Sequence, residues 1–156
     1  MHAFQCAFFV RIEYVKPMAK FDLESNLNNT SDKLKNLFTF LGDFKNFSSI
    51  LPEDKVENFQ YQENQCSFSI KGITPMTIKM QDKKPVEYIL FTSQGLAKFD
   101  FALTVNFIGS AEETGQCKIK LSGDLNPFIL SMAEKSLKNL VDTMSTKLSE
   151  LNTLSK

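Results

Sequence analysis

The stretch CKIKLSGDLNPFILSMAEKSLKNLVDTMSTKLSEL, residues 117–151, decides the fold, because its pattern changes there from that of a strand to that of a helix. Residues 117–122 alternate between apolar and polar side chains, which is the period of a half-buried strand. Asn126 is a favourable N-cap, and Pro127 suits the first position of a helix. Several apolar side chains lie within about 60° of Leu137 on a wheel of 100° per residue: Leu130, Ala133, Leu140, Val141, Met144, Leu148 and Leu151. This predicts a long C-terminal helix whose apolar stripe covers one face of a sheet.

The preceding half of the chain also has the two-residue period of strands. The predicted strands cover residues 56–62, 66–71, 75–81, 86–93 and 99–108. Turn-forming residues separate them, including residues 82–85 between the third and fourth of these strands. Short connections between closely spaced strands indicate an antiparallel meander. The alternation is clearest in residues 99–108, so one face of the sheet is expected to be solvated and the other covered.

Two short helices are expected before this meander and after a first strand at residues 21–25. Thr30 or Ser31 can cap the first helix, which would carry Asp32 in its first turn and end at Gly42. The apolar stripe of this helix has helical spacing and consists of Leu34, Leu37, Phe38 and Leu41. Asp43 can cap a second short helix, which carries Phe44 and Phe47 and ends before Pro52.

The first seventeen residues, MHAFQCAFFVRIEYVKP, stand apart from this order of elements. They have no basic start and no small-residue cleavage site, so they fit a secretory signal poorly. One interpretation is that residues 1–17 are an extension outside the domain and that a single domain covers residues 18–156. The other is that residues 8–15, which are rich in strand formers, add a strand to the sheet.

Composition narrows the possible functions. The chain has 156 residues, of which 42% are hydrophobic, and its 18 basic and 18 acidic residues balance to a formal charge of zero. A zero balance argues against nucleic-acid binding, and the apolar content argues against disorder. No apolar run reaches the length of about 20 residues that a transmembrane helix needs. Fifteen phenylalanines without any tryptophan indicate a thick, dry interior.

Residues that commonly carry chemistry are scarce. His2 is the only histidine, which disfavours a catalytic triad or a histidine metal site. Cys6, Cys66 and Cys117 form no C-x-x-C pair, so neither a zinc nor a redox motif is indicated, and a reducing cytoplasm is the simplest compartment. The adjacent carboxylates of Glu53 and Asp54 would point in opposite directions in a strand. We therefore expect no catalytic residue, no metal and no cofactor.

The order of strand, two short helices, six strands and long helix resembles the START-like superfamily, also called the helix-grip or SRPBCC group. The resemblance covers residues 20–152 and includes the strings DFKNF (43–47), LPED (51–54) and DLNP (124–127). The group contains polyketide cyclases, the birch-pollen allergen family and lipid-transfer domains, and this chain is similar to its small, single-domain bacterial members. The resemblance implies an α+β fold in which a curved antiparallel sheet of about seven strands wraps around the C-terminal helix.

The resemblance also implies a hydrophobic cavity between the sheet and that helix. From the sheet, its predicted lining is Phe68, Ile70, Ile78, Met80, Tyr88, Leu90, Phe101, Leu103, Val105, Ile119 and Leu121. From the helix, it is Ala133, Leu137, Leu140 and Met144. The alternative is that the same residues fill a solid core, because protein interiors normally pack densely.

Three functions are compatible with an interior that is either a cavity or a solid core. The first is non-enzymatic binding of an apolar small molecule such as a lipid, a fatty acid or a polyketide-like compound. The second is a protein-interaction module with a filled core, and the third is a cyclase- or dehydratase-like enzyme. We expect a monomer or a homodimer, with neither nucleic acid nor a transmembrane segment.

One pair of residues breaks the helical pattern. Phe128 and Met132 lie opposite the apolar stripe of the C-terminal helix, beside Lys135 and Asp142. If exposed, they would form a portal lip, a dimer contact or a patch that touches a membrane. The alternative is that they are covered locally, by residues 123–125 or by residues 1–17.

Overall fold

The computed structural model describes residues 19–70, 75–93 and 100–152. Its strands are β1 (Ala19–Glu24), β2 (Asn28–Asn29), β3 (Val56–Tyr61), β4 (Gln65–Ile70), β5 (Met76–Lys84), β6 (Tyr88–Ser93), β7 (Asp100–Ile108) and β8 (Gln116–Leu125). Its helices are α2 (Leu34–Leu41), the short 3₁₀ helix η1 (Phe44–Ile50) and α3 (Pro127–Glu150). This is the predicted α+β order, with one further two-residue strand.

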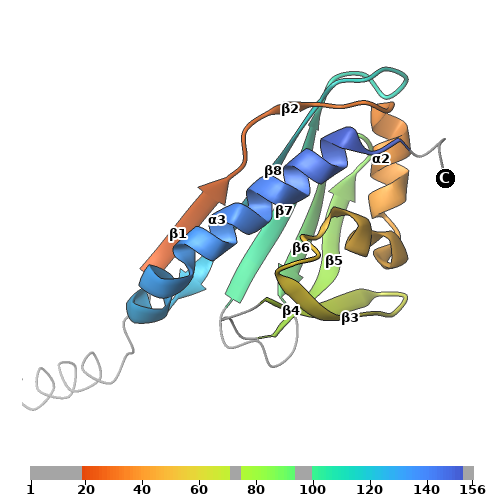
Figure 1. Cartoon of the computed structure of the whole chain (residues 1–156). Coiled ribbons are helices and arrows are strands. Elements are labelled where there is room, and N and C mark those ends of the chain that lie inside the picture. The colour runs from red at the N-terminus through yellow and green to blue at the C-terminus, as the bar shows by residue number, and fades with distance from the viewer. Residues whose placement is uncertain (1–18, 71–74, 94–99, 153–156) are drawn as a thin grey trace, which may run out of the picture.

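One antiparallel sheet contains all the strands. Its order is β1-β8-β7-β6-β5-β4-β3, and β2 continues along β8 beyond β1. Helix α3 runs across one face of this sheet, while α2 and η1 lie beside the C-terminal half of α3 (Figure 1). The arrangement is the helix grip that the sequence predicts, and the apolar core lies between the sheet and the three helices.

Helix α3 begins and ends where the sequence indicates. The side chain of Asn126 accepts a hydrogen bond of 2.8 Å from the Phe128 N–H, and Pro127 occupies the first turn. At the other end, the Ser31 N–H donates to the carbonyl of Ser149 at 2.8 Å. The ammonium of Lys147 donates to the Leu51 carbonyl, also at 2.8 Å. These contacts fasten the last turns of α3 to the segments that precede α2 and follow η1.

The start of α2 differs from the predicted side-chain cap. Its N-cap residue is Lys33, which makes no side-chain cap, and neither Thr30 nor Ser31 takes that place. Instead, the N–H groups of Leu34 and Lys35 donate to the carbonyls of Glu113 and Ala111, each at 3.0 Å. The loop between β7 and β8 therefore satisfies donors that a capping side chain would otherwise take. The predicted end at Gly42 and the Asp43 cap of η1 are confirmed.

Two strands are longer than predicted. Strand β5 continues through Lys84, so residues 82–84 belong to a strand and not to the predicted turn. The register of β5 against β6 shifts between Met80 and Asp82, and residues 82–84 then pair with the start of β6. Strand β8 likewise continues to Leu125, where it pairs with Ala19. Among the described residues, no helix is long and apolar enough to cross a membrane.

Candidate functional site: the interior between the sheet and the helices

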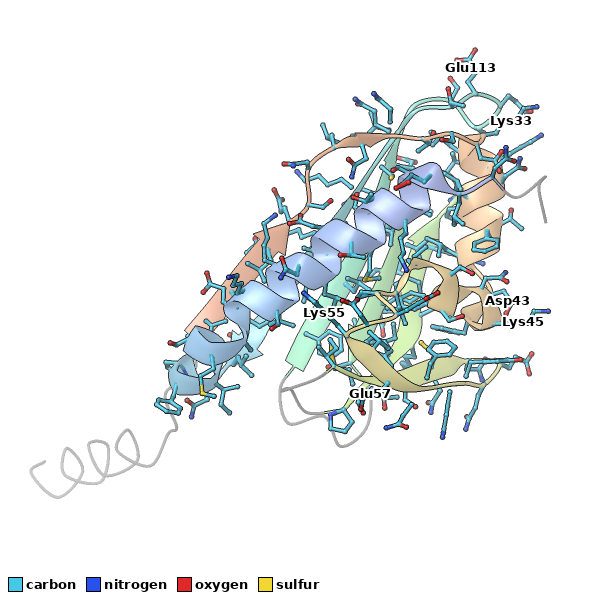
Figure 2. All side chains as sticks on the ribbon, in the orientation of Figure 1. Lys33, Asp43, Lys45, Lys55, Glu57 and Glu113 are labelled. Atoms are coloured by element: carbon cyan, nitrogen blue, oxygen red, sulfur yellow. The ribbon has the colours of Figure 1, made fainter. Side chains whose placement is uncertain are left out.

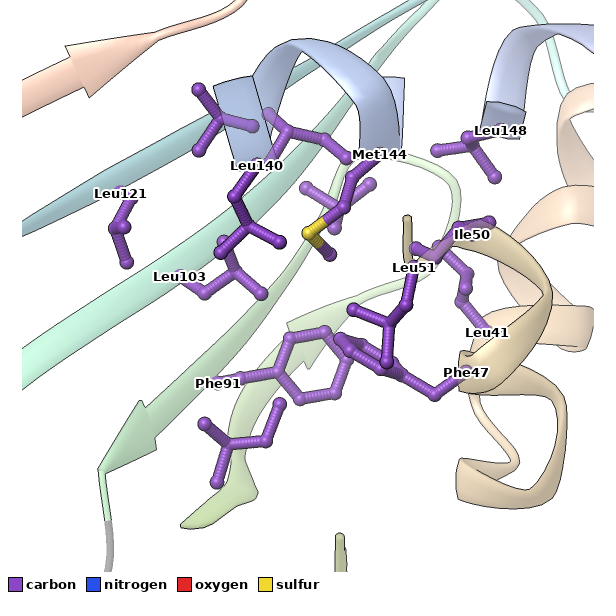
Figure 3. Close-up of a cluster of buried hydrophobic side chains, with 14 of the residues drawn as sticks. Leu41, Phe47, Ile50, Leu51, Phe91, Leu103, Leu121, Leu140, Met144 and Leu148 are labelled. Carbon is purple, nitrogen blue, oxygen red and sulfur yellow. The ribbon is translucent and has the colours of Figure 1, made fainter. Parts of the chain in front are cut away.

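Most of the predicted lining residues do lie together inside the grip. One continuous buried cluster contains Phe68, Ile70, Ile78, Phe101, Leu103, Val105, Ile119, Leu121, Ala133, Leu137, Leu140 and Met144. The alternation of β7 and β8 places their apolar side chains on the inner face, opposite the stripe of α3. Figure 3 shows Leu103, Leu140 and Met144 converging from the sheet and from α3. The sequence pattern is therefore correct for the two strands whose alternation is clearest.

The prediction for β6 is wrong by one residue. Tyr88 and Leu90 are paired with Asn106 and Thr104, on the outer face of the sheet. The inward side chains are those of Ile89 and Phe91, both 0% exposed. Neighbours across a ladder share a face, so β7, whose register is unambiguous, determines which side chains of β6 point inward.

The outer position of Tyr88 gives its hydroxyl a different role from the one expected inside a cavity. The hydroxyl donates a hydrogen bond of 2.8 Å to the carboxylate of Asp82 on β5. This bond to Asp82 raises the pKa of Tyr88. The Met80 side chain is only partly buried, because the register of β5 shifts directly after it. None of the three residues, Met80, Tyr88 and Leu90, belongs to the fully buried lining.

Helix η1 contributes side chains to the interior that the predicted lining omits. The ring of Phe47 lies 6.4 Å from the ring of Phe68, centroid to centroid, and stacks on it. The Phe44 ring meets the Phe91 ring edge to face at 5.7 Å. Phe44 and Phe47 therefore pack on the inner face of β4 and β6, and Figure 3 shows Phe47 of η1 beside Phe91 of β6. The helical spacing of Phe44 and Phe47 was a usable signal, but nothing in the sequence assigned η1 to this face.

Helix α2 closes the same end of the core. Leu34, Leu37 and Leu41 are all 0% exposed, which confirms the predicted stripe except for Phe38. Phe38 is half-buried and meets the ring of Phe107 edge to face at 6.1 Å. The interior beside α2 and η1 is thus filled by side chains from helices as well as from strands.

The hollows found on the described residues lie open at the surface. The one of about 660 Å³ is a groove beside α2 and η1 that is lined by Asn36, Phe38, Thr39, Phe40, Gly42, Asp43, Asn46 and Lys83. Another, of about 400 Å³, lies near the ends of β6, β7 and β8. The first is lined by none of the predicted cavity residues, and the second by one of them, Phe101.

Groups that could move a proton are few inside the described core. Its buried polar residues are Ser25, Thr30, Asp32, Ser145 and Ser149, and Asp32 is the sole charged one among them. The Asp32 carboxylate accepts hydrogen bonds from the Lys33 N–H and the Asn36 amide, beside the start of α2. The charged side chains of Lys33, Asp43, Lys45 and Glu113, which flank α2 and η1, lie at the periphery of the fold (Figure 2). Within the described ranges, no group of acidic, histidine or cysteine side chains could hold a metal ion.

The two described cysteines are buried and poorly suited to nucleophilic chemistry. Desolvation raises the pKa of Cys66 to about 12 and that of Cys117 to about 11. The Cys117 thiol also donates weakly to the carbonyl of Ser145, with sulfur and oxygen 3.8 Å apart. A thiolate is the reactive form of cysteine, so neutral buried thiols act here as small apolar side chains. Both are free of disulfide bonds, and Cys6 lies outside the described residues.

The first turns of α3 carry an exposed apolar patch. Phe128 is 75% exposed, Met132 70% and Ile129 47%. Residues 123–125 belong to β8 and do not cover them, so that alternative is wrong. Residues 1–17, the other proposed cover, lie outside the described part of the chain.

Solved structures with the same arrangement include norcoclaurine synthase from Thalictrum flavum, which matches with a TM-score of 0.63 at 8% identity over 85% of this chain and 86% of that one. A START superfamily protein from Mycobacterium smegmatis matches with a TM-score of 0.54 at 10% identity over 84% and 96% of the two chains. A conserved protein from Geobacillus kaustophilus gives 0.55 at 12% identity over 85% and 91%. No family model and no curated protein matches the sequence. The antiparallel sheet, the long C-terminal helix and these structural likenesses show that the chain has a START-like, SRPBCC-type fold.

Proposed function

We propose that the protein binds an apolar small molecule, such as a lipid, a fatty acid or a polyketide-like compound, and does no chemistry on it. The observation that carries this proposal is the composition of the interior. Every inward side chain of β7 and β8 that faces α3 is apolar, and Asp32, the one buried charge among the described residues, lies apart from them beside α2. Selectivity in such a site comes from its shape and from a few polar anchors.

The binding site lies beside the N-terminal half of α3. Around the C-terminal half, η1 and α2 supply Phe47, Ile50 and Leu41, which are 0% exposed. Farther toward the start of α3, Ala133 is the only small residue of its stripe, and it retains 4% exposure, as does Phe101. We therefore place the ligand among Phe101, Leu103, Leu121, Ala133, Leu137 and Leu140. The side chains of Leu and Phe can change rotamer to admit it, and α3 can move outward from the sheet.

A titration with cis-parinaric acid, a fluorescent fatty acid, tests this site in the full chain. We expect saturable binding of one molecule per chain, and native mass spectrometry of the purified protein should find an apolar molecule bound. Ala133→Leu fills the space and should weaken binding about tenfold or more. Glu134→Leu adds the same side chain on the exposed neighbour and serves as the control. A wild-type chain without saturable binding and without a bound molecule contradicts the proposal.

A second function, protein interaction through the surface of a solid domain, is favoured by a different observation. The rings of Phe44, Phe47, Phe68 and Phe91 already fill the interior beneath β4 and β6. Under this alternative the purified chain has no apolar ligand, and it elutes with a stoichiometric protein partner. Monomer or homodimer, and a reducing cytoplasm, remain predictions. Norcoclaurine synthase is an enzyme by name, but at 8% identity its fold alone is shared.

A further inference from the structure

Strand β8 carries a glycine on its inner face, near the end that leads into α3. Leu121 and Leu125 are buried, and because side chains alternate along a strand, Gly123 between them also faces the helix. The backbone does not require glycine here, because Gly123, unlike Gly109, has no positive φ and β8 pairs with both its neighbours in unbroken register through it. A glycine inside a strand lowers stability and often marks a place where a ligand or another backbone approaches closely.

Two phenylalanines stand on either side of this glycine. Phe21 of β1 and Phe101 of β7 both pair with Gly123. Neighbours across a ladder share a face, so both phenyl groups also belong to the inner face. Adjacent strands lie about 4.8 Å apart, which places the two phenylalanines roughly 10 Å from each other with Gly123 midway. A further flat ring over Gly123 would lie about 5 Å from each, within the range of about 4.5–7 Å that aromatic pairs prefer.

Helix α3 is also narrow at this point. It packs mainly against β8 and β1, and its first buried residue is Ala133. Ala133 is about 10 Å along the helix from Asn126, and Gly123 is about 10 Å from Asn126 along the strand. The two small residues therefore lie at about the same distance from the turn, on facing elements. Ala133 and Phe101 are each 4% exposed, whereas Leu137, one turn farther along α3, is 0% exposed.

We propose that the apolar ligand carries a flat aromatic ring, which lies over Gly123 between the rings of Phe21 and Phe101 and against Ala133. This inference rests on the proposed function, because it names the class of molecule that the same site binds. A saturated ring or an acyl chain gains burial of apolar area there, but it makes no contacts between aromatic rings. The site therefore binds an aromatic molecule more tightly than a saturated one of the same size.

Two bicyclic alcohols with the same carbon skeleton test this preference in the full chain. 2-Naphthol is flat and aromatic, whereas trans-decahydro-2-naphthol is saturated, and each is titrated by isothermal calorimetry. We expect about tenfold or more tighter binding of 2-naphthol, as two contacts between aromatic rings would give. Equal affinities, or tighter binding of the saturated alcohol, overturn the aromatic ring but leave the proposed function intact if cis-parinaric acid binds. A chain that binds neither alcohol nor cis-parinaric acid overturns both.

Gly123→Val tests where the ring lies. The valine side chain fills the position between Phe21 and Phe101, so it should weaken binding of 2-naphthol about tenfold or more. Valine favours strands, so the midpoint of urea unfolding should stay the same or rise. Ser122→Val is the control, because it adds the same side chain to the outer face of β8 and should bind 2-naphthol as the wild type does. A folded Gly123→Val protein with wild-type affinity overturns the proposal.

Variants of the two flanking rings keep the test valid if Gly123→Val does not fold. Phe21→Leu and Phe101→Leu each replace a ring by an apolar side chain that cannot stack. Each should reduce the preference for 2-naphthol over the saturated alcohol severalfold, because one contact between aromatic rings is lost. The affinity for the saturated alcohol should change less than that for 2-naphthol. An unchanged preference in both variants overturns the proposal.

Discussion

The rings of Phe47 and Phe91 meet edge to face, with their centroids 5.4 Å apart and their planes at 76°. Both side chains are fully buried. This contact joins η1 to the middle of the sheet, although the two residues are far apart in the sequence. It fixes a short 3₁₀ helix that has little stability of its own, and it makes one half of the interior solid.

Phe47→Ala should therefore be strongly destabilising. It removes a fully buried ring that packs on three others, and such truncations cost about 3–5 kcal/mol. Urea unfolding followed by circular dichroism measures the loss. Tyr61→Ala, at a side chain that is 53% exposed, is the matched control and should cost less than about 1 kcal/mol. Equal losses in the two variants would mean that η1 does not pack as described.

A substitution on the buried side of α3 should destabilise the protein far more than one on its exposed side. Leu137 is 0% exposed, so Leu137→Glu places an unpaired charge in the core and should prevent folding. Phe128→Ser changes a side chain that is 75% exposed and should alter the free energy of unfolding by about 1 kcal/mol or less. Circular dichroism and a thermal melt distinguish them. A normally folded Leu137→Glu protein would contradict the orientation of α3.

Gly115→Ala should loosen the junction of β7, β8 and α2. A methyl group there would fall onto the carbonyl oxygen of Ile108 and lie 2.9 Å from Cδ1 of Leu34. Backbone cannot yield cheaply, so we expect a loss of about 1–3 kcal/mol in a denaturant melt. Gly42→Ala is the control: its methyl group would meet the Thr39 carbonyl oxygen at 3.3 Å, and its φ of −68° suits alanine. If both glycines tolerate alanine equally, the close approach at Gly115 is absent in solution.

Because the thiols of Cys66 and Cys117 are buried, the free energy of unfolding should fall at alkaline pH. Folding raises the pKa of Cys66 from 9.0 to about 12 and that of Cys117 from 9.0 to about 11. Between these values the unfolded chain has lost protons that the folded chain still holds, so the folded state is progressively disfavoured. The stability contribution is complete below about pH 9 and declines as the pH rises from there through the folded-state values. Melts at pH 8 and pH 10 measure this decline.

The same thiols also provide a chemical test. At pH 8, Ellman's reagent should leave Cys66 and Cys117 unmodified in the folded protein and should react with both in urea. A Cys66→Ala, Cys117→Ala double variant should lose the part of the alkaline destabilisation that these groups cause. Rapid modification of either cysteine in the native protein would contradict its burial.

The sequence predicted the elements whose local signals agree with their surroundings. Asn126 and Pro127 mark the start of α3 correctly, and the strict alternation of residues 101–107 identifies the inner face of β7. The register of β6 was not predictable from its own residues, because Tyr88, Ile89, Leu90 and Phe91 are all compatible with a buried position. Pairing with β7 decides it, and pairing is a long-range property.

The hydrogen-bond partners at the start of α2 and the place of the η1 side chains in the core could not be predicted for the same reason. The donors at the start of α2 are satisfied by carbonyls of Ala111 and Glu113, nearly eighty residues away, so no local motif could reveal them. The phenylalanines of η1 were recognisable as an apolar face, but their destination depends on how the chain returns beneath β4 and β6. The candidate site was therefore predicted well along α3, β7 and β8 and poorly where helices meet the sheet.

The two ends of α3 are held to the rest of the fold by different numbers of contacts. Its last turns are held by the Lys147–Leu51 and Ser31–Ser149 hydrogen bonds, whereas its first two turns extend past the sheet with mostly exposed side chains. Local separation is cheapest where the fewest buried contacts must break. We therefore expect the first turns of α3 to separate from the sheet more readily than its last turns, so that amide protons near Ala133 exchange with solvent sooner than those near Leu148.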